Sequence, residues 1–159
     1  MNKKVLSIVL SWLMVAIVMF IIVNFSLESS EKSSATSEQI VNSVISGADT
    51  ITSSQREMIS LVTRKLAHFG IYMLLGFCFF NAFSFTLSKK FVYLELFSCL
   101  FAFLFSLFDE FVIQNIAFDR APQITDVLID FTGIIVGTAV YLALFIIVRK
   151  FNKKTETSS

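Results

Sequence analysis

Lys65, His68 and Tyr72 follow one another at intervals of three and four residues near the start of an apolar segment. On an α-helix these positions lie on one face, so the three side chains point the same way. A lysine binds phosphate or carboxylate, an imidazole transfers protons near neutral pH, and a phenol forms hydrogen bonds. The spacing predicts a helical face that binds an anion or takes part in acid–base chemistry.

Two further groups of polar residues stand at the ends of other apolar segments. Asp109 and Glu110 end one segment, with Gln114 one turn later, and Asp126 and Asp130 begin another. Charged groups in or beside a membrane span are costly and are therefore functional suspects. General acid–base catalysis uses an imidazole together with carboxylates. The candidate catalytic residues are His68, Asp109, Glu110, Asp126 and Asp130.

The elements that must position these groups are membrane helices. Hydrophobic residues make up 55% of the chain, against roughly 45–50% in a soluble domain. Four apolar runs lie at about residues 5–25, 66–87, 91–113 and 126–148, each near the roughly 17–25 residues needed to cross a bilayer. The runs do not alternate as the strands of a β-barrel do. We expect an all-α, integral membrane four-helix bundle that forms a single domain over residues 1–159.

The segment between the first and second runs is polar. Ser and Thr fill 14 of the 35 positions in residues 26–60, which also carry five acidic and two basic side chains. Ser37 is placed to cap a short helix at the membrane surface that stops near Gly47. Ser54 and Glu57 have the spacing of a capping box for the next helix. The composition predicts an extracytoplasmic Ser/Thr-rich segment after the first span.

The basic residues predict the orientation. The stretches MNKK, SKK and RKFNKK all fall on one side of a bundle with four spans. Because cytoplasmic loops are enriched in Lys and Arg, we expect a multi-pass protein of the plasma membrane with both termini in the cytoplasm. Arg64 and Lys65 lie on the other side and weaken this bias. The polar groups then gather at the outer leaflet, below the loop Asn115–Thr125 that carries Arg120.

The outer polar groups also have a purely structural interpretation. Gly133 and Gly137 continue the helical face of Asp130 and offer a smooth strip for close helix approach. An ion pair such as Lys65 with Asp109 would hold helices together without any further role. This alternative stands beside the functional one.

The remaining polar residues within the spans have simpler interpretations. Glu95 lies one turn into the third span, from where it would reach Lys89 or Lys90 by snorkelling. Cys78 and Cys99 sit in apolar runs without a second Cys or a His at ligand spacing. We interpret both cysteines as apolar packing residues, and no metal site is predicted.

Two stretches, RKLAHFGIY and DE…Q…R…P…TDVLIDFTGIIVG, resemble the VanZ-like family, over about residues 20–140. The residues that match are Lys65, His68, Phe69, Tyr72, Asp109, Glu110, Gln114, Arg120, Asp126, Val127, Gly133 and Gly137. Gln114 stands one residue further from the acidic pair than the family pattern has it, which predicts a one-residue insertion in the following loop. The resemblance implies an accessory factor that lowers teicoplanin susceptibility, and it supplies no biochemical activity.

Two functions of different classes fit these residues. The first is a non-enzymatic cell-envelope protein that binds a lipid-linked wall precursor, an anionic lipid or the antibiotic itself. Its ligand-binding residues would be Lys65, His68, Tyr72, Asp109, Glu110, Gln114, Arg120, Asp126 and Asp130. The second is a small intramembrane enzyme acting on a lipid or lipid-linked sugar. A third interpretation is structural, in which the helices brace a partner complex. The sequence identifies no protein partner. No cofactor is predicted, and the net charge of +1 argues against nucleic-acid binding.

Overall fold

The computed structural model describes residues 2–27, 39, 52–87, 90–114 and 123–156 of the chain. The helices are α1 (Lys3–Ser26), α3 (Ser53–Thr86), α4 (Phe91–Phe108), the short π-helix η1 (Asp109–Ile113) and α6 (Ile124–Glu156). The described residues contain no strand. Four segments are long and apolar enough to cross a membrane, namely Lys3–Ser26, Ser54–Thr86, Phe91–Ile113 and Ile124–Lys150. The expected all-α fold with four spans is confirmed.

The second helix begins at Ser53, close to the start expected at Ser54 and well before the apolar run that begins near Leu66. The residues that form its capping box are Thr52 and Gln55. The Thr52 side chain accepts from the Gln55 amide, and the Gln55 side chain accepts from the Thr52 amide. The pair expected at Ser54 and Glu57 therefore lies inside the helix.

Two expectations fall outside the described residues. One is the surface helix from Ser37 to Gly47, and the other is Arg120 in the loop before α6.

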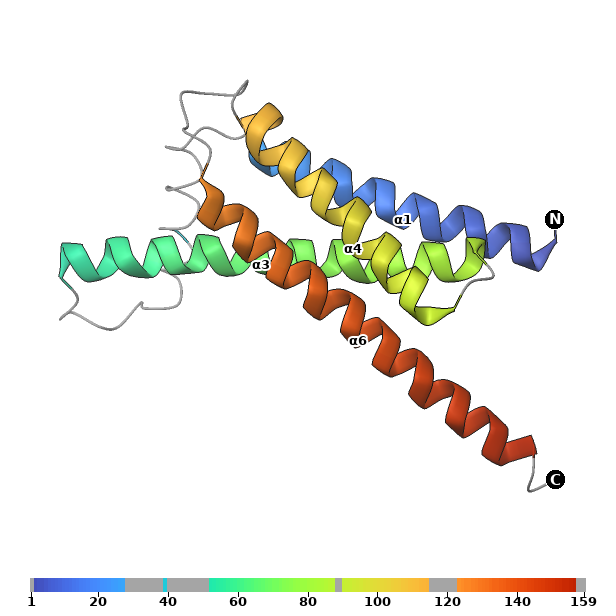
Figure 1. Ribbon diagram of the computed structural model, residues 1–159. Coiled ribbons are helices and arrows are strands. Elements are labelled where there is room, and N and C mark those ends of the chain that lie inside the picture. The colour runs from blue at the N-terminus through green and yellow to red at the C-terminus, as the bar shows by residue number, and fades with distance from the viewer. Residues whose placement is uncertain (1, 28–38, 40–51, 88–89, 115–122, 157–159) are drawn as a thin grey trace.

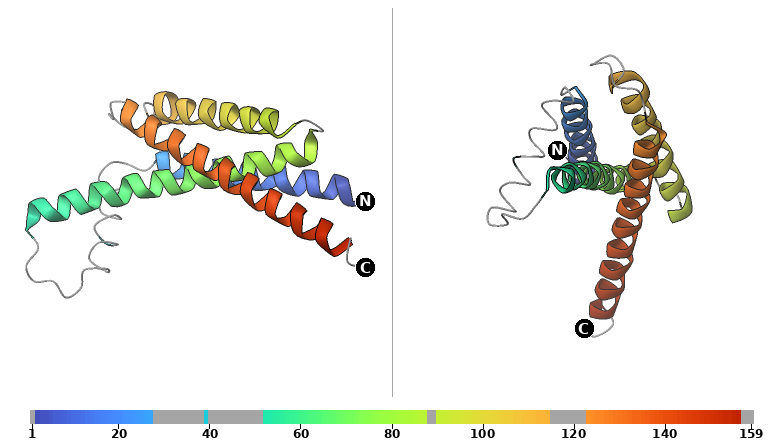
Figure 2. Two further views of the ribbon diagram at one scale, coloured as in Figure 1. Left: turned by 60° about the horizontal axis from the view of Figure 1, so that its bottom comes forward. Right: turned by 90° about the vertical axis from the view of Figure 1, so that its left-hand side faces the viewer.

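Helix α3 is the central element of the bundle. It packs against α1, α4 and α6, and its most extensive contact is with α6. The N-terminal turns of α3 extend beyond the other helices, and the C-terminal half of α6 diverges from them (Figures 1 and 2). The start of α1 and the end of α6 lie at one end of the molecule. The start of α6, the end of α1 and η1 lie at the other, which we call the polar end.

The close approach of α3 and α6 depends on two glycines of α6 and on Gly76 of α3, whose added Cβ would lie 2.5 Å from the carbonyl oxygen of Ile134. A Cβ atom on Gly133 would lie 2.5 Å from the carbonyl oxygen of Phe69, and one on Gly137 would overlap the carbonyl oxygen of Met73. The expected smooth strip on α6 is therefore confirmed as a helix contact. Small residues let helix backbones meet within a membrane, where no hydrophobic effect drives helices together. This contact sets the distance between α3 and α6 next to His68.

Candidate functional site

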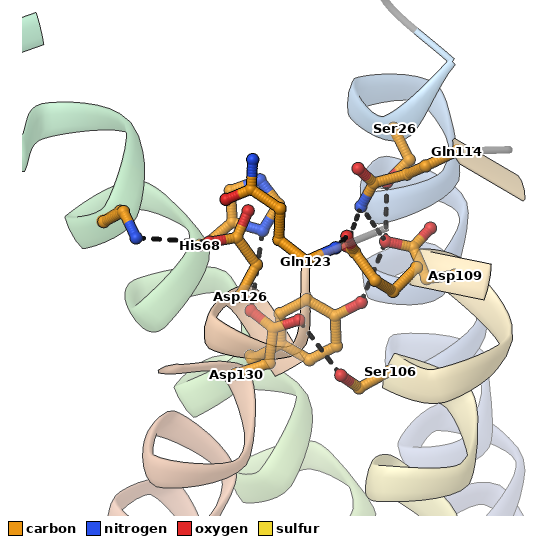
Figure 3. A network of polar contacts seen from close by, with 11 residues as sticks. Ser26, His68, Ser106, Asp109, Gln114, Gln123, Asp126 and Asp130 are labelled. Atoms are coloured by element: carbon orange, nitrogen blue, oxygen red, sulfur yellow. Dashed lines mark hydrogen bonds and ion pairs between the residues drawn. The ribbon is translucent and has the colours of Figure 1, made fainter. Parts of the chain in front are cut away.

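Side chains from all four membrane helices converge at the polar end of the bundle. Figure 3 shows Ser26 from α1, His68 from α3, Ser106 at the end of α4 and Asp130 from α6 around a common centre. Asp109, Glu110, Gln114 and Asp130 are each at least 96% buried. We call the residues joined here, namely Ser26, Lys65, His68, Tyr72, Ser106, Asp109, Glu110, Gln114, Asp126 and Asp130, the polar cluster.

The expected face of α3 meets three carboxyl groups in order. The Lys65 Nζ lies 3.4 Å from an Asp126 oxygen, and the His68 Nδ1 lies 3.5 Å from Asp130 Oδ1. One turn further, the Tyr72 hydroxyl donates to Asp109 Oδ2 at 3.1 Å. The sequence interpretation paired Lys65 with Asp109, which is wrong. Lys65 reaches α6 because the first turn of α6 lies closest to it.

Asp109 joins three parts of the chain through one oxygen atom. Its Oδ2 accepts a hydrogen bond from Ser26 of α1 at 2.7 Å, besides the one from Tyr72. Gln114 also donates to this oxygen, at 3.4 Å. The side chain is fully buried. Removing this carboxylate would leave several buried donors without an acceptor, which is costly inside a protein.

The π-helix η1 sets the positions of Glu110 and Gln114. The backbone amide of Gln114 donates to the Asp109 carbonyl, five residues earlier. The Gln114 side chain donates to Glu110 Oε2 at 2.6 Å, and the backbone amide of Gln123 donates to Glu110 Oε1 at 2.7 Å. A π-turn holds one more residue than an α-turn, and such turns are frequent at functional sites.

Asp130 and His68 form an acid–imidazole pair. The Ser106 hydroxyl donates to Asp130 Oδ2 at 3.0 Å, which fixes the carboxyl group. Asp130 is 1% exposed, whereas the His68 side chain is 24% exposed. The imidazole therefore lies between the buried acid and the molecular surface. An imidazole beside a carboxyl group is a combination that general acid–base catalysis uses.

Three buried atoms of the polar cluster have no hydrogen-bond partner among the described residues. They are His68 Nδ1, Asp109 Oδ1 and Asp130 Oδ1, all buried. His68 Nδ1 and Asp130 Oδ1 are close to each other but do not meet hydrogen-bond geometry. Most buried polar atoms in proteins are paired with protein groups, water or an ion. These three atoms therefore leave room for a further hydrogen-bond partner in the polar cluster.

A pocket of about 60 Å³ opens beside the polar cluster, between α3 and α6. Its lining residues are Leu61, Arg64, Lys65, His68, Gln123, Asp126 and Ile129. Among the described residues Arg64 has no ion-pair partner, and Lys65 is 45% exposed. Within the same residues, no group of three or more His, Cys, Asp or Glu side chains is arranged to hold a metal ion. The pocket offers cationic donors and one imidazole to a small anionic group.

The structure brings most of the sequence-predicted residues together. Those that meet in the polar cluster are Lys65, His68, Tyr72, Asp109, Glu110, Gln114, Asp126 and Asp130. Arg120 lies outside the described residues. Sequence reasoning left Ser26, Ser106 and the Gln123 amide out of the candidate site. Ser106 carried a signal, because Leu94, Ser98, Ala102 and Ser106 form a four-residue repeat on the buried face of α4.

Comparison with known proteins gives one match. The family model described as VanZ/LLP1 matches residues 10–147, which cover most of the chain. No curated protein and no solved structure shows a significant match to the chain. The matched segment includes every residue of the polar cluster.

Proposed function

Because this chain belongs to the VanZ/LLP1 family, we propose that it is an accessory cell-envelope factor that lowers teicoplanin susceptibility. It acts by binding the anionic group of an amphiphile, such as a lipid-linked wall precursor, in the pocket at the polar end. The protein is a multi-pass membrane protein, so its ligand approaches from the bilayer or its surface.

The observation that carries the proposal is the composition of the pocket. Arg64, Lys65 and His68 line it on α3, and Arg64 has no ion-pair partner among the described residues. A guanidinium binds phosphate or carboxylate with two parallel hydrogen bonds. Leu61 and Ile129 add apolar walls, which suit a ligand that carries a hydrocarbon part. An anionic amphiphile has both kinds of group.

We also propose that the polar end faces the outside of the cell. The starts of α1 and α4 and the end of α6, which carry Lys3, Lys4, Lys90 and the stretch RKFNKK, lie at the end opposite the polar cluster. By the positive-inside rule that end is cytoplasmic. The pocket then faces the outer surface, where wall precursors and glycopeptides meet. A cysteine introduced beside the pocket, for example Ser60→Cys, should react with a membrane-impermeant thiol reagent on intact cells.

The first test measures antibiotic susceptibility. The wild type, Arg64→Ala and a His68→Ala, Asp130→Ala double variant are expressed at matched membrane levels in a susceptible Gram-positive host. Arg149→Ala serves as the control, because it removes an exposed arginine at the other end of α6. We expect the wild type and the control to raise the inhibitory concentration of teicoplanin, and the other variants to lose that effect. Equal protection by all four proteins would reject the proposal.

The second test measures binding directly. Purified protein in lipid nanodiscs is titrated with a fluorescent polyprenyl phosphate, and inorganic phosphate serves as competitor. We expect Arg64→Ala to weaken binding and Arg149→Ala to leave it unchanged. Competition by inorganic phosphate would assign recognition to the phosphate alone, and its failure would assign part of it to the hydrocarbon chain. Identical titrations for both variants would contradict the pocket as the binding site.

A second candidate function rests on the pair of His68 and Asp130. A half-buried imidazole beside a carboxyl group and two cations suits acid–base catalysis on a lipid or lipid-linked sugar. Product formation by the purified protein from a lipid-linked substrate tests this reading. An inactive His68→Ala variant that still binds the polyprenyl phosphate would favour an enzyme. Unchanged substrate with the wild type would leave the binding function as the better account.

A further inference from the structure

Two acidic side chains of the bundle have different surroundings. Glu95 of α4 accepts a hydrogen bond from Thr138 of α6 at 2.7 Å and does not line the pocket. It forms no ion pair with Lys90, so the snorkelling expected toward Lys90 is wrong, and Lys89 lies outside the described residues. Asp126, in contrast, lines the pocket. Of these two acids, Asp126 is the one placed to meet the ligand proposed above.

The pocket has two walls of different chemistry. One wall carries Arg64, Lys65 and His68 of α3, and the other carries Gln123 and Asp126 at the start of α6. Arginine and lysine side chains only donate hydrogen bonds, whereas a carboxylate only accepts them. The pocket therefore offers cationic donors on the α3 wall and acceptors on the α6 wall.

The acceptors at the start of α6 are open to a ligand. Asp126 Oδ1 lies 3.4 Å from the Lys65 Nζ, and among the described residues its Oδ2 receives no hydrogen bond. The Asp126 side chain is 14% exposed and lines the pocket together with Gln123 and His68 (Figure 3). The side-chain amide of Gln123 also forms no hydrogen bond with any described residue. The α6 wall thus presents unused acceptors to whatever enters the pocket.

An anionic ligand without a hydrogen-bond donor is poorly matched to these two walls. Its phosphate oxygens would bind Arg64 and Lys65 but would also lie near the Asp126 carboxylate, and like charges at short distance repel each other. An acceptor that loses its water and gains no donor also costs binding free energy. A hydroxyl group next to the phosphate would offset both costs, because it would donate a hydrogen bond to Asp126.

The charges of the pocket favour a hydroxyl over an ammonium group as this donor. Arg64 and Lys65 are cationic and Asp126 is anionic, which leaves one positive charge in excess among these three side chains. The single negative charge of a phosphate diester balances that excess. A neutral hydroxyl keeps the balance, whereas an ammonium group would add another positive charge.

We propose that the pocket is selective for a phosphate ester that carries a hydroxyl group beside its phosphate, and that Asp126 sets this selectivity. The phosphate binds the donors on α3, and the hydroxyl donates to Asp126. Headgroups with this chemistry are sugar phosphates and glycerol phosphates. The inference rests on the function proposed above, because it specifies the headgroup of the same ligand.

Competition among small phosphate esters tests the selectivity. Fluorescent polyprenyl phosphate is bound to the wild type in lipid nanodiscs and is displaced by ethyl phosphate, ethylene glycol phosphate or ethanolamine phosphate. These esters differ in one terminal group, which is hydrogen, hydroxyl or ammonium. We expect ethylene glycol phosphate to act at about a tenfold lower concentration than ethyl phosphate, because it gains one hydrogen bond to a charged group. Stronger displacement by ethanolamine phosphate than by ethylene glycol phosphate would overturn the choice of a hydroxyl.

Variants of Asp126 separate its charge from its hydrogen bond. In Asp126→Ala, ethyl phosphate should bind more tightly because the repulsion is gone, and the preference for ethylene glycol phosphate should disappear. Asp126→Asn keeps an acceptor, so part of the preference should remain. Glu57→Ala is the matched control and should keep the wild-type preference, because Glu57 is an exposed acid of α3 that does not line the pocket.

The preference is a ratio measured on one preparation, so a smaller amount of folded protein does not change it. If Asp126 served only to stabilise the first turn of α6, its removal would leave the ratio unchanged. Glucose phosphate and glycerol phosphate, added in the same assay, distinguish the two kinds of headgroup. Preferred displacement by one of them identifies the headgroup, and either result supports the proposal.

Failure of this inference differs from failure of the proposed function. Equal displacement of the probe by ethyl phosphate and ethylene glycol phosphate in the wild type would overturn the selectivity and leave the anion site in place. A preference that survives in Asp126→Ala would overturn the role of Asp126. Lack of displacement by every phosphate ester would reject the anion site itself, and this inference with it.

Discussion

At the polar end a single residue, Asp109, links α1, α3 and η1, because its carboxyl group accepts hydrogen bonds from buried donors on all three. At the opposite end α1 and α3 meet mainly through aromatic rings. There the indole of Trp12 packs edge-on against Phe79 and Phe83, and its N–H donates to Thr86 at 2.9 Å. One end is held by hydrogen bonds to a buried carboxyl group, and the other by aromatic rings and one hydrogen bond between neutral groups.

The two ends also differ in how tightly the helices pack. Near His68 and Tyr72 the backbones of α3 and α6 are in contact at Gly133 and Gly137. Toward its C-terminus α6 diverges, and Leu144, Ile147 and Val148 are about half exposed. Lipid covers apolar side chains as well as a neighbouring helix does, so divergence has little cost. Buried carboxyl groups must instead find hydrogen-bond donors within the bundle, which requires the helices to pack closely at the polar end.

The largest effect is expected from closing the glycine contact. Gly137→Ala should destabilise the bundle by about 3 kcal/mol, the upper end for overpacking, because the new Cβ overlaps a backbone oxygen that cannot move aside. Gly70→Ala is the matched control, since nothing lies within 4 Å of its added Cβ. The free energy of unfolding in lipid bicelles is measured for both. A destabilisation of equal size in both variants would contradict the contact as the cause.

The next effect compares one hydrogen-bond acceptor from each end. Asp109→Ala should lower the free energy of unfolding by about 2 kcal/mol, because the donors on Ser26, Tyr72 and Gln114 lose a buried acceptor. Thr86→Val removes the acceptor of the Trp12 N–H and should cost about 0.6 kcal/mol, a typical value for hydrogen bonds within membranes. The same unfolding assay serves for both. If the Thr86 variant is the less stable of the two, the polar end does not hold the bundle together.

The sequence predicted the helices and one face of the site, since both follow from periodicity. Four apolar runs indicated the four spans, and the spacing of Lys65, His68 and Tyr72 placed them on one face. Gly133 and Gly137 likewise indicated a close contact with another helix. Each of these patterns depends only on positions within a single helix.

The partners across helices were not predictable in the same way. Whether Lys65 reaches Asp109 or Asp126 depends on how α3 is rotated relative to α4 and α6, and periodicity does not report that rotation. Ser26 and Ser106 are single small polar residues within apolar runs, a pattern also typical of ordinary helix contacts. The π-turn at η1 has no composition that distinguishes it from an α-turn.

Two tyrosines allow a finer comparison of the two ends. Tyr72 donates to the fully buried Asp109, and Tyr141 donates to the half-buried amide of Asn81. Tyr72→Phe should cost about 1.5 kcal/mol because a fully buried carboxyl oxygen loses one of its donors, whereas Tyr141→Phe should cost about 0.6 kcal/mol. Each change removes one hydroxyl and little else. Equal losses in the unfolding assay would mean that the carboxyl group of Asp109 adds nothing to the hydrogen bond.

The smallest effect on stability is expected at Arg64. This side chain lines the pocket but forms no ion pair among the described residues, so Arg64→Ala should change the free energy of unfolding by less than about 0.5 kcal/mol. The same variant should lose protection against teicoplanin, because the pocket loses its guanidinium. Stability and protection are measured on one membrane preparation. A variant that loses both stability and protection would show that Arg64 supports the fold. The loss of protection would then be no evidence for a ligand site at the polar end.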